Sequence, residues 1–532
     1  MQATKKTNRQ TSRPLPRILS VLLAAAMSLC ALVGCGAAKD SGAPNEGGMD
    51  DLLYGSFYNA GAAEQNGDAE SGETDPGFVE NPFVETAKQD TSTFSADVDT
   101  ASYALFRKTV TSWVNQKANV QTVLSALEKS ASSFRTEEFL NYFRYEANVP
   151  SDGELFGTTA GIIPCPWNAQ SRLLRLTLQA PSTTPSGGNN LVFLIDVSGS
   201  MSSDDKLPLL KTAFSYLAEQ PTAADRVSVV TYSGKEEVIL EGCPGNETAR
   251  ILEAVNGLSA HGATNGEDGL RKAYRLAADY RIEGGNNRII MASDGDLNVG
   301  ISSETELKTF VEGKRDEGIF LSVLGFGSGN YRDRNMEALA DNGNGVYYYI
   351  DGVSEAQKVF GTDLISTLYT VAKDVKLQLT FDPTYVEKYR QIGYENRQLA
   401  KEDFTDDTKD AGEVGAGHQV TVFYELILTD AATGESASET AKWMELAVRY
   451  KEPNGDVSQE NTYTLGASEQ RNANEDEAFM LCVIELTMLL HDSEHLPEGT
   501  TYRTVRDALR TLDLTANTAR SEFRELVEKL VE

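Results

Sequence analysis

The sequence predicts an α/β protein in which a doubly wound parallel sheet is inserted between two flanking segments that form a β-sandwich with additional helices. Three observations predict this class. Short apolar runs alternate with helix-length segments between residues 187 and 374, runs of period two lie on both sides of that stretch, and helical segments end the chain. Strands that alternate with helices favour a parallel sheet with helices on both faces.

The central stretch, residues 187–374, is predicted to form the doubly wound domain, and about 185 residues is an ordinary domain size. Short apolar runs are typical of strands that are buried on both faces. The strand candidates are 191–196, 226–232, 288–292, 319–325 and 346–350. The helix candidates between and after them are 205–219, 247–258, 266–281, 303–316, 332–341 and 354–373.

The flanking segments, residues 81–186 and 375–532, each contain too few strand patterns for a stable sheet of their own. We therefore expect strands from both flanks to join into one sandwich, with the terminal helices packed beside it. The expected strands are 172–178, 375–381, 419–428 and 444–450. The expected helices are 99–114, 120–131, 136–143, 475–491, 501–511 and 516–531.

The first 35 residues have the pattern of an export signal. Five basic residues and no acidic ones precede an apolar stretch at 18–33, which is short for a membrane span. The stretch ends in Leu-Val-Gly-Cys, which resembles the lipobox of bacterial lipoproteins, in which the cysteine is lipidated. We therefore predict a signal peptide at 1–34, lipidation at Cys35, and a flexible tether at 35–80 that anchors the folded part at the outer face of a membrane.

The chain is strongly acidic, with a formal net charge of −31 that becomes −36 once the signal peptide is removed. This charge argues against a nucleic-acid partner, which requires a basic surface. Three cysteines remain after processing, Cys165, Cys243 and Cys482, and the absence of a Cys-x-x-Cys pair excludes a zinc ribbon. Two of them could form a disulfide in an exported protein, and small buried thiols are the alternative.

Oxygen-bearing side chains lie at the ends of two predicted strands and in one glycine-rich loop (residues 261–266). They are Asp196, Ser198, Ser200, Thr264 and Asp294. The carboxyl ends of parallel strands meet at one edge of a sheet, where open α/β sheets bind ligands. Hydroxyl and carboxylate oxygens suit a hard divalent cation. The sequence therefore predicts a metal site for Mg²⁺, with Mn²⁺ or Ca²⁺ as alternatives.

This set of residues resembles the metal-ion-dependent adhesion site of von Willebrand factor type A (VWA) domains. The flanks are similar to those of a bacterial lipoprotein subfamily with dedicated N- and C-terminal regions, in segments 92–103, 165–168 (Cys-Pro-Trp-Asn), 389–397 and 415–418 (Gly-Ala-Gly-His). The resemblance implies that the two serines and Thr264 give hydroxyl oxygens to the ion. Asp196 and Asp294 would hold it directly or through water, and one open position would accept a carboxylate from a partner protein.

Three functions are compatible with these patterns. The preferred one is a non-enzymatic, membrane-anchored module that binds a protein partner through the ion. In the second, the metal only stabilises the fold of an envelope scaffold protein. The third is a zinc hydrolase that uses a His-x-x-Glu-His pattern, residues His491, Glu494 and His495. Pro497 and Gly499 follow that pattern at once and indicate a helix end instead.

Overall fold

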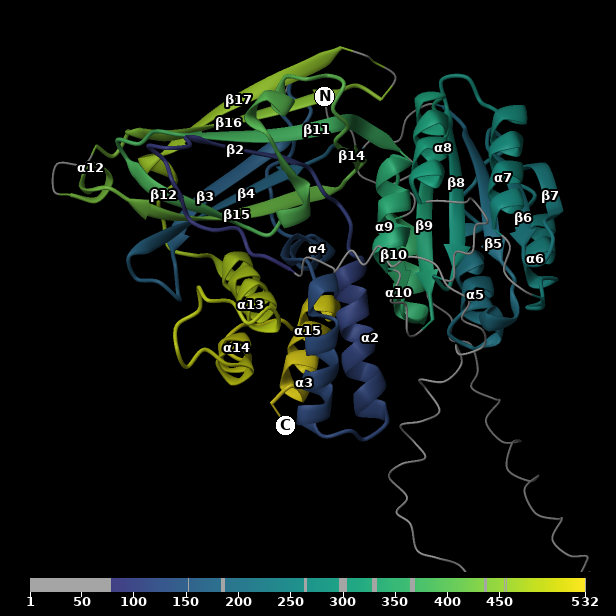
Figure 1. The fold of residues 1–532 in the computed structure, drawn as a ribbon, viewed down its shortest axis with the longest axis horizontal. Helices are drawn as coiled ribbons and strands as arrows, with labels where there is room; N and C mark the ends of the chain where they lie inside the picture. The colour runs from purple at the N-terminus through teal and green to yellow at the C-terminus, as the bar shows by residue number, and fades with distance from the viewer. Residues whose placement is uncertain are drawn as a thin grey trace, which may run out of the picture. The chain divides into compact units, whose positions relative to one another are not determined.

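The structure, a computed structural model, describes residues 78–531 apart from 152, 183–186, 263–265, 296–303, 328–332, 364–368, 435–437, 454 and 456. Cys35, the expected signal peptide and nearly all of the expected tether lie outside the described residues. Residues 75–532 belong to one compact unit, and its described strands form three sheets (Figure 1). None of the helices in the described part is both long and apolar enough to cross a bilayer.

The central sheet contains the five expected strands and one more. Its order is β10-β9-β8-β5-β6-β7, and the strands from β10 to β6 run parallel. The additional strand β7 pairs antiparallel with β6 at the sheet edge, because the short segment 233–236 between them leaves no room for a crossover helix. The strands are β5 (Asn189–Asp196), β6 (Arg226–Tyr232), β7 (Glu237–Pro244), β8 (Asn286–Ser293), β9 (Phe320–Phe326) and β10 (Tyr347–Ile350).

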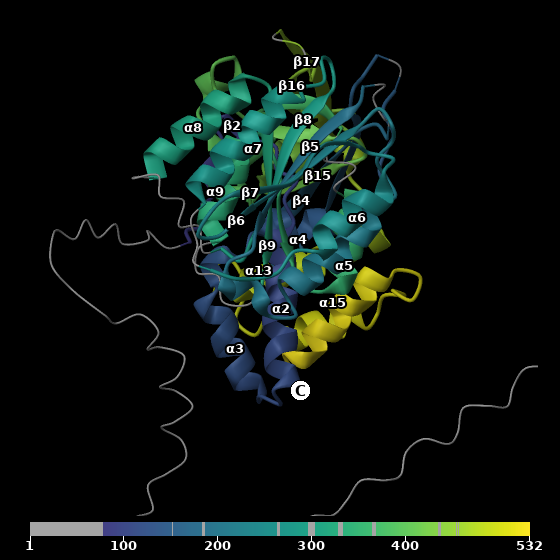
Figure 2. The same ribbon diagram turned by 90° about the vertical axis from the view of Figure 1, so that its right-hand side faces the viewer.

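Successive residues of β5 face opposite sides of the sheet and pack into two separate cores. Leu191, Phe193 and Ile195 lie in one core with α5, α6 and α10, whereas Val192 and Leu194 lie in the other with α7, α8 and α9. Figure 2 shows the sheet between these two layers of helices, which confirms the predicted doubly wound fold. The helices are α5 (Leu207–Leu217), α6 (Thr248–Asn256), α7 (Glu267–Asp279), α8 (Glu304–Asp316), α9 (Asp333–Asn342) and α10 (Val353–Lys358).

The helix expected at 354–373 is shorter in the structure. After α10 the chain makes one π-helical turn, η3 (Val359–Asp363), and Thr370 is already the first residue of strand β11 (Thr370–Phe381). Val371 and Ala372 are buried in the core of the sandwich. Packing against that core decides the conformation of this segment, because its own sequence is compatible with either structure.

The two flanks form one sandwich, as expected from their strand patterns. Strand β2, before the central domain, pairs with β11 after it, and β4 pairs with β15 in the same way. The first sheet runs β1 (Val84–Glu85), β12 (Val386–Ile392), β15 (Gln419–Leu428), β4 (Ser171–Gln179), β3 (Gly157–Pro164). The second runs β13 (Gln398–Leu399), β2 (Thr91–Ser95), β11, β16 (Lys442–Lys451), β17 (Ser458–Gly466), and β14 (Gly412–Gly415) also pairs with β11.

Helices from both flanks share a further core beside the sandwich, here called the helical core. Phe139 and Phe143 from the N-terminal flank pack with Phe479 and Phe523 from the C-terminal flank. Figure 1 shows the two groups of helices side by side. They are α2 (Ala101–Asn115), α3 (Val120–Lys129), α4 (Thr136–Tyr142), α13 (Glu475–Leu490), α14 (Tyr502–Leu509) and α15 (Thr518–Lys529).

Two buried arginines of the flanks bind carboxylates of the central domain. Arg107 of α2 pairs with Asp351 and Glu355, at the start of α10. Arg397, just before β13, pairs with carboxylates of α9 and of the N-terminal flank, namely Glu337, Asp341, Asp97 and Asp99. The central domain is therefore held to the flanks by charged contacts as well as by the chain connections.

The Cys-Pro-Trp-Asn segment surrounds a buried carboxylate. Glu425 of β15, which is 1% exposed, accepts hydrogen bonds from three side chains of the segment 165–171 and from Arg390 at 3.0 Å. Burial alone would raise its pKa, but Arg390 and the other donors hold the pKa of Glu425 below its usual value. The segment therefore fixes the connection between β3 and β4 onto β15.

Replacing this carboxylate with an amide should destabilise the sandwich. We expect Glu425→Gln to lower the free energy of unfolding by about 2 kcal/mol, because the buried Arg390 loses its counter-charge and an amide N–H₂ faces other donors. Urea unfolding should show an earlier midpoint. The control is Glu445→Gln on β16, an exposed side chain, and equal midpoints for the two variants would contradict the structural role of Glu425.

Candidate metal-binding site

Two carboxylates lie at the carboxyl edge of the central sheet, at the ends of neighbouring strands. Asp196 is the last residue of β5, and Asp294 directly follows β8. The two strands pair in parallel, with Ile195 opposite Ala292. Parallel pairing of adjacent strands thus brings both acidic residues to the same place, as the sequence pattern predicts.

Two serine hydroxyls lie beside the first carboxylate. The backbone N–H of Ser198 donates to Asp196 Oδ1 at 2.8 Å, and the Oγ atoms of Ser198 and Ser200 are 2.9 Å apart. Ser200 belongs to a 3₁₀ turn, η2 (Gly199–Ser202), which directly follows Ser198. Asp196 and Ser198 are buried and Ser200 is exposed, so the group opens toward solvent at Ser200.

Ser293 connects the two strand ends. Its Oγ donates to Asp196 Oδ2 at 3.4 Å and accepts from the N–H of Gly295 at 3.2 Å. Gly295 has φ +90°, a left-handed backbone conformation that residues other than glycine rarely adopt. This turn leaves Asp294 at the sheet edge with 6% of its surface exposed.

The electrostatics of the site favour a bound cation. Burial raises the pKa of Asp196 to about 6, and the charge of Asp294 adds to that rise, while hydrogen bonds from Ser198 lower it. Two neighbouring carboxylates in a buried setting repel each other, and a cation between them relieves both the repulsion and the desolvation. Lys206 supplies one positive charge, since its Nζ lies 2.8 Å from Asp294 Oδ2.

The loop that leads to Thr264 runs beside the serine turn. The N–H of His261 donates to the carbonyl of Val197 at 2.7 Å, and the N–H of Gly199 donates to the carbonyl of Gly262 at 3.1 Å. Thr264 itself lies outside the described residues. The backbone contacts of its neighbours show that the third predicted segment begins at the edge where the first two meet.

The donor set fits a small divalent cation. Two carboxylates and two hydroxyls are the hard oxygen ligands that Mg²⁺ and Mn²⁺ accept. Among the residues that the structure describes, no group of three or more His, Cys, Asp or Glu side chains could hold a metal ion. The candidate site combines its two carboxylates with hydroxyl oxygens instead.

The alternative zinc pattern does not form a metal-binding group in the described structure. Helix α13 ends at Leu490, and Asp492 has φ +52°, so His491 and His495 do not share a helical face. The Nε2 of His491 lies 2.8 Å from the carbonyl of Phe134, and its ring stacks on Phe78. This geometry is that of a structural histidine at a helix end.

The three described cysteines are free and buried. They are Cys165, Cys243 and Cys482. Cys165 and Cys482 belong to the helical core, and Cys243 belongs to one core of the central domain. The thiols thus match the small buried side chains that the sequence left open as an alternative to a disulfide.

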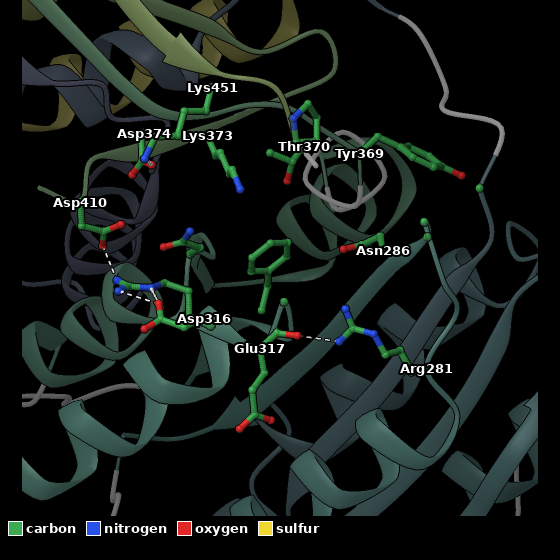
Figure 3. A pocket seen from close by; sticks show the side chains of 18 of the residues that line it. Arg281, Asn286, Asp316, Glu317, Tyr369, Thr370, Lys373, Asp374, Asp410 and Lys451 are labelled. Atoms are coloured by element: carbon green, nitrogen blue, oxygen red, sulfur yellow. Dashed lines mark hydrogen bonds and ion pairs between the residues drawn. The ribbon is translucent and has the colours of Figure 1, made fainter. Parts of the chain in front are cut away.

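A separate cavity of about 650 Å³ lies at the opposite edge of the central sheet (Figure 3). Asn189, Asn286 and Phe320 line it, and each is the first residue of its strand. Two ion pairs lie in its wall, Arg315–Asp410 at 2.6 Å and Lys451–Asp374 at 2.7 Å. The cavity lies at the junction of the central domain with the sandwich. No sequence pattern predicted this cavity.

Comparison with known families agrees with this architecture. Residues 190–362 match the family described as von Willebrand factor type A domain, residues 366–532 match "Uncharacterized protein YfbK, C-terminal", and residues 72–175 match "von Willebrand factor". The solved structure "von Willebrand factor type A from Catenulispora acidiphila" aligns with 73% of this chain and 89% of its own, at 16% identity and a TM-score of 0.40.

Two curated relatives show how far the similarity extends. Inter-alpha-trypsin inhibitor heavy chain H3 of Mesocricetus auratus is 32% identical over 190 residues, which cover 34% of this chain and 21% of that protein. The YfbK protein of Escherichia coli (strain K12) is 37% identical over 474 residues, which cover 85% of this chain and 80% of that protein. The chain therefore belongs to the YfbK family and carries a VWA domain followed by a YfbK-type C-terminal region.

Proposed function

We propose that this chain is a lipid-anchored envelope protein that docks a protein partner through a divalent cation bound at the carboxyl edge of its VWA sheet. A VWA domain indicates a protein-interaction module. The observation that carries the metal-dependent form of this function is the placement of buried Asp196 and Asp294 on neighbouring strand ends, beside a pair of serine hydroxyls.

Each residue of the site has a distinct role in this proposal. Asp196 and Asp294 neutralise the ion, either directly or through water, and Ser198, Ser200 and Thr264 contribute hydroxyl oxygens. Hydroxyl ligands add no negative charge, so a bound ion would keep a strong attraction for a further carboxylate. Ser200 is exposed at the opening of the group, and a carboxylate from the partner protein would approach there.

The proposed lipid anchor and tether would locate this docking at the outer face of a membrane. Lipidation at Cys35 would hold the protein at the outer face of a membrane, and residues 36–80 would separate the folded part from the lipid surface. A flexible segment of this length has a root-mean-square reach of roughly 35 Å. The site would therefore meet partners in the envelope, and we propose that it binds them without catalysing a reaction.

Cross-linked capture from the native envelope tests this function. We expect the wild-type protein to retain a specific set of proteins in Mg²⁺ and to lose that set in EDTA. Retention of the same proteins under both conditions would contradict metal-dependent docking. If Mg²⁺ raises the melting temperature and no captured protein depends on it, the metal has the purely stabilising role of an envelope scaffold.

A further inference from the structure

Lys206 brings an ammonium group into the candidate metal site. Its Nζ lies 2.8 Å from Asp294 Oδ2 and 2.9 Å from the backbone carbonyl oxygen of Ser200. The Lys206 side chain is 18% exposed and the Asp294 side chain is 4% exposed. The ammonium therefore contacts two of the residues assigned to the ion, one through its carboxylate and the other through its backbone.

The stem of Lys206 is held in place rather than free on the surface. It crosses Gly327, at the end of β9, where an added Cβ would lie only 2.3 Å from Lys206 Cε. Gly327 has φ +86°, a conformation that favours glycine, and the missing side chain leaves room for the Lys206 stem. The Lys206 N–H also donates to the carbonyl of Ser203 at 3.0 Å, which fixes the backbone just before α5.

The charges at the site explain why the position of this lysine matters. Asp196 and Asp294 are buried next to each other, and without a cation their mutual repulsion has no relief. Lys206 is a basic side chain in contact with one of them, Asp294. A divalent ion at this site would draw on the same carboxylate of Asp294 that the ammonium now binds, so the two cations compete for its negative charge.

We propose that Lys206 is the internal counter-cation of the metal-free site, and that a divalent ion must displace it from Asp294 to bind. This inference rests on the proposed metal site and adds a control of its loading. The ammonium stabilises the two carboxylates when no metal is present. By the same contact it lowers the affinity for the metal, and so raises the cation concentration at which the site fills.

Calorimetric titration of Mg²⁺ into the metal-free protein tests the inference, with Lys206→Met as the main variant. Methionine keeps much of the stem and removes the charge. We expect Lys206→Met to bind Mg²⁺ about 10-fold more tightly than the wild type, because it removes the competing charge; the size of the change, though not its sign, is that seen when groups in contact with metal ligands are mutated. Salt at about 0.15 M screens diffuse attraction to this acidic surface.

Two further variants separate the local effect from a general change of charge. Lys211→Met, in the helix α5 that follows Lys206, removes a lysine whose contacts in the described part of the chain are the backbone carbonyls of Asn256 and Leu258, and its Mg²⁺ affinity should equal that of the wild type. Lys206→Arg keeps the positive charge and should stay within about threefold of the wild type. A second readout is thermal unfolding: Lys206→Met should melt earlier in EDTA and show a larger rise on addition of Mg²⁺.

The outcomes distinguish this inference from the function on which it rests. Equal Mg²⁺ affinity in the wild type and Lys206→Met, with equal melting shifts, would overturn the role of Lys206 and leave the metal site intact. Saturable binding only in Lys206→Met would be the strongest support for competition. If neither protein binds Mg²⁺, the metal site and the inference both fail.

Discussion

Asp196→Ala is expected to weaken Mg²⁺ binding by about 100-fold or more, while the protein remains folded. Loss of groups that only support metal ligands already costs 10- to 100-fold in affinity, and Asp196 is assigned to the ion itself. Its carboxylate also positions the serine turn through the N–H of Ser198 at 2.8 Å. Removing it therefore takes away one charge and loosens the hydroxyl donors. Calorimetric titration measures the change in affinity.

The fold should survive this substitution because the carboxylate is not a net source of stability without a cation. Burial and the neighbouring Asp294 raise the pKa of Asp196 to about 6, which means that its ionised form costs folding free energy at neutral pH. We expect the melting temperature in EDTA to stay within about 3 °C of the wild type. Asp204→Ala, an exposed residue of the same loop, is the control, and wild-type affinity in Asp196→Ala would rule out the assigned site.

Arg107→Ala is expected to lower the free energy of unfolding by about 3–5 kcal/mol, the cost of removing one partner from a buried ion pair. The Arg107 Nε and Nη2 atoms bind the two oxygens of Asp351 at 2.7 and 2.6 Å, and Nη2 also binds Glu355 at 2.7 Å. The three side chains are 5%, 8% and 1% exposed. Alanine would leave Asp351 buried without this counter-charge and Glu355 with only the longer contact to Lys358 at 3.9 Å, at the contact of α2 with the VWA domain.

Urea unfolding measures this loss, with two comparison variants. Arg107→Lys should recover only part of the stability, because an ammonium cannot bind Asp351 through two parallel hydrogen bonds. Arg250→Ala breaks an exposed pair with Glu247, whose side chains are 57% and 43% exposed, and should change stability by less than about 0.5 kcal/mol. Similar midpoints for Arg107→Ala and Arg250→Ala would show that the contact between α2 and the VWA domain adds no stability.

The elements with a strong local pattern were predictable from the sequence. The apolar runs of the central sheet predicted five of its strands, since a strand covered by helices on both faces must be apolar throughout. Strand β7 was missed because it lies at an edge, where four of its eight residues are only half-buried. The helix expected at 354–373 was too long because residues 370–373 become a strand only by pairing with β14 and β16.

The residues of the candidate metal site that lie at strand ends were predictable from the sequence. Asp196 and Asp294 come together because β5 and β8 are neighbours, which the doubly wound pattern predicts. Lys206 gave no such signal, because 88 residues separate it from Asp294 and only the fold of the loop before α5 brings its ammonium there. The cavity at the opposite edge was missed for the same reason, since its walls come from both the VWA domain and the sandwich.

The most direct test of the metal site is an anomalous difference map from crystals of the wild-type protein grown with Mn²⁺. The account predicts one strong peak at the carboxyl edge of the central sheet. The peak should lie within about 2.2 Å of its direct ligands, drawn from the oxygens of Asp196, Ser198, Ser200, Thr264 and Asp294, with Lys206 turned away from Asp294. A peak elsewhere, or no peak at saturating Mn²⁺, would contradict the account.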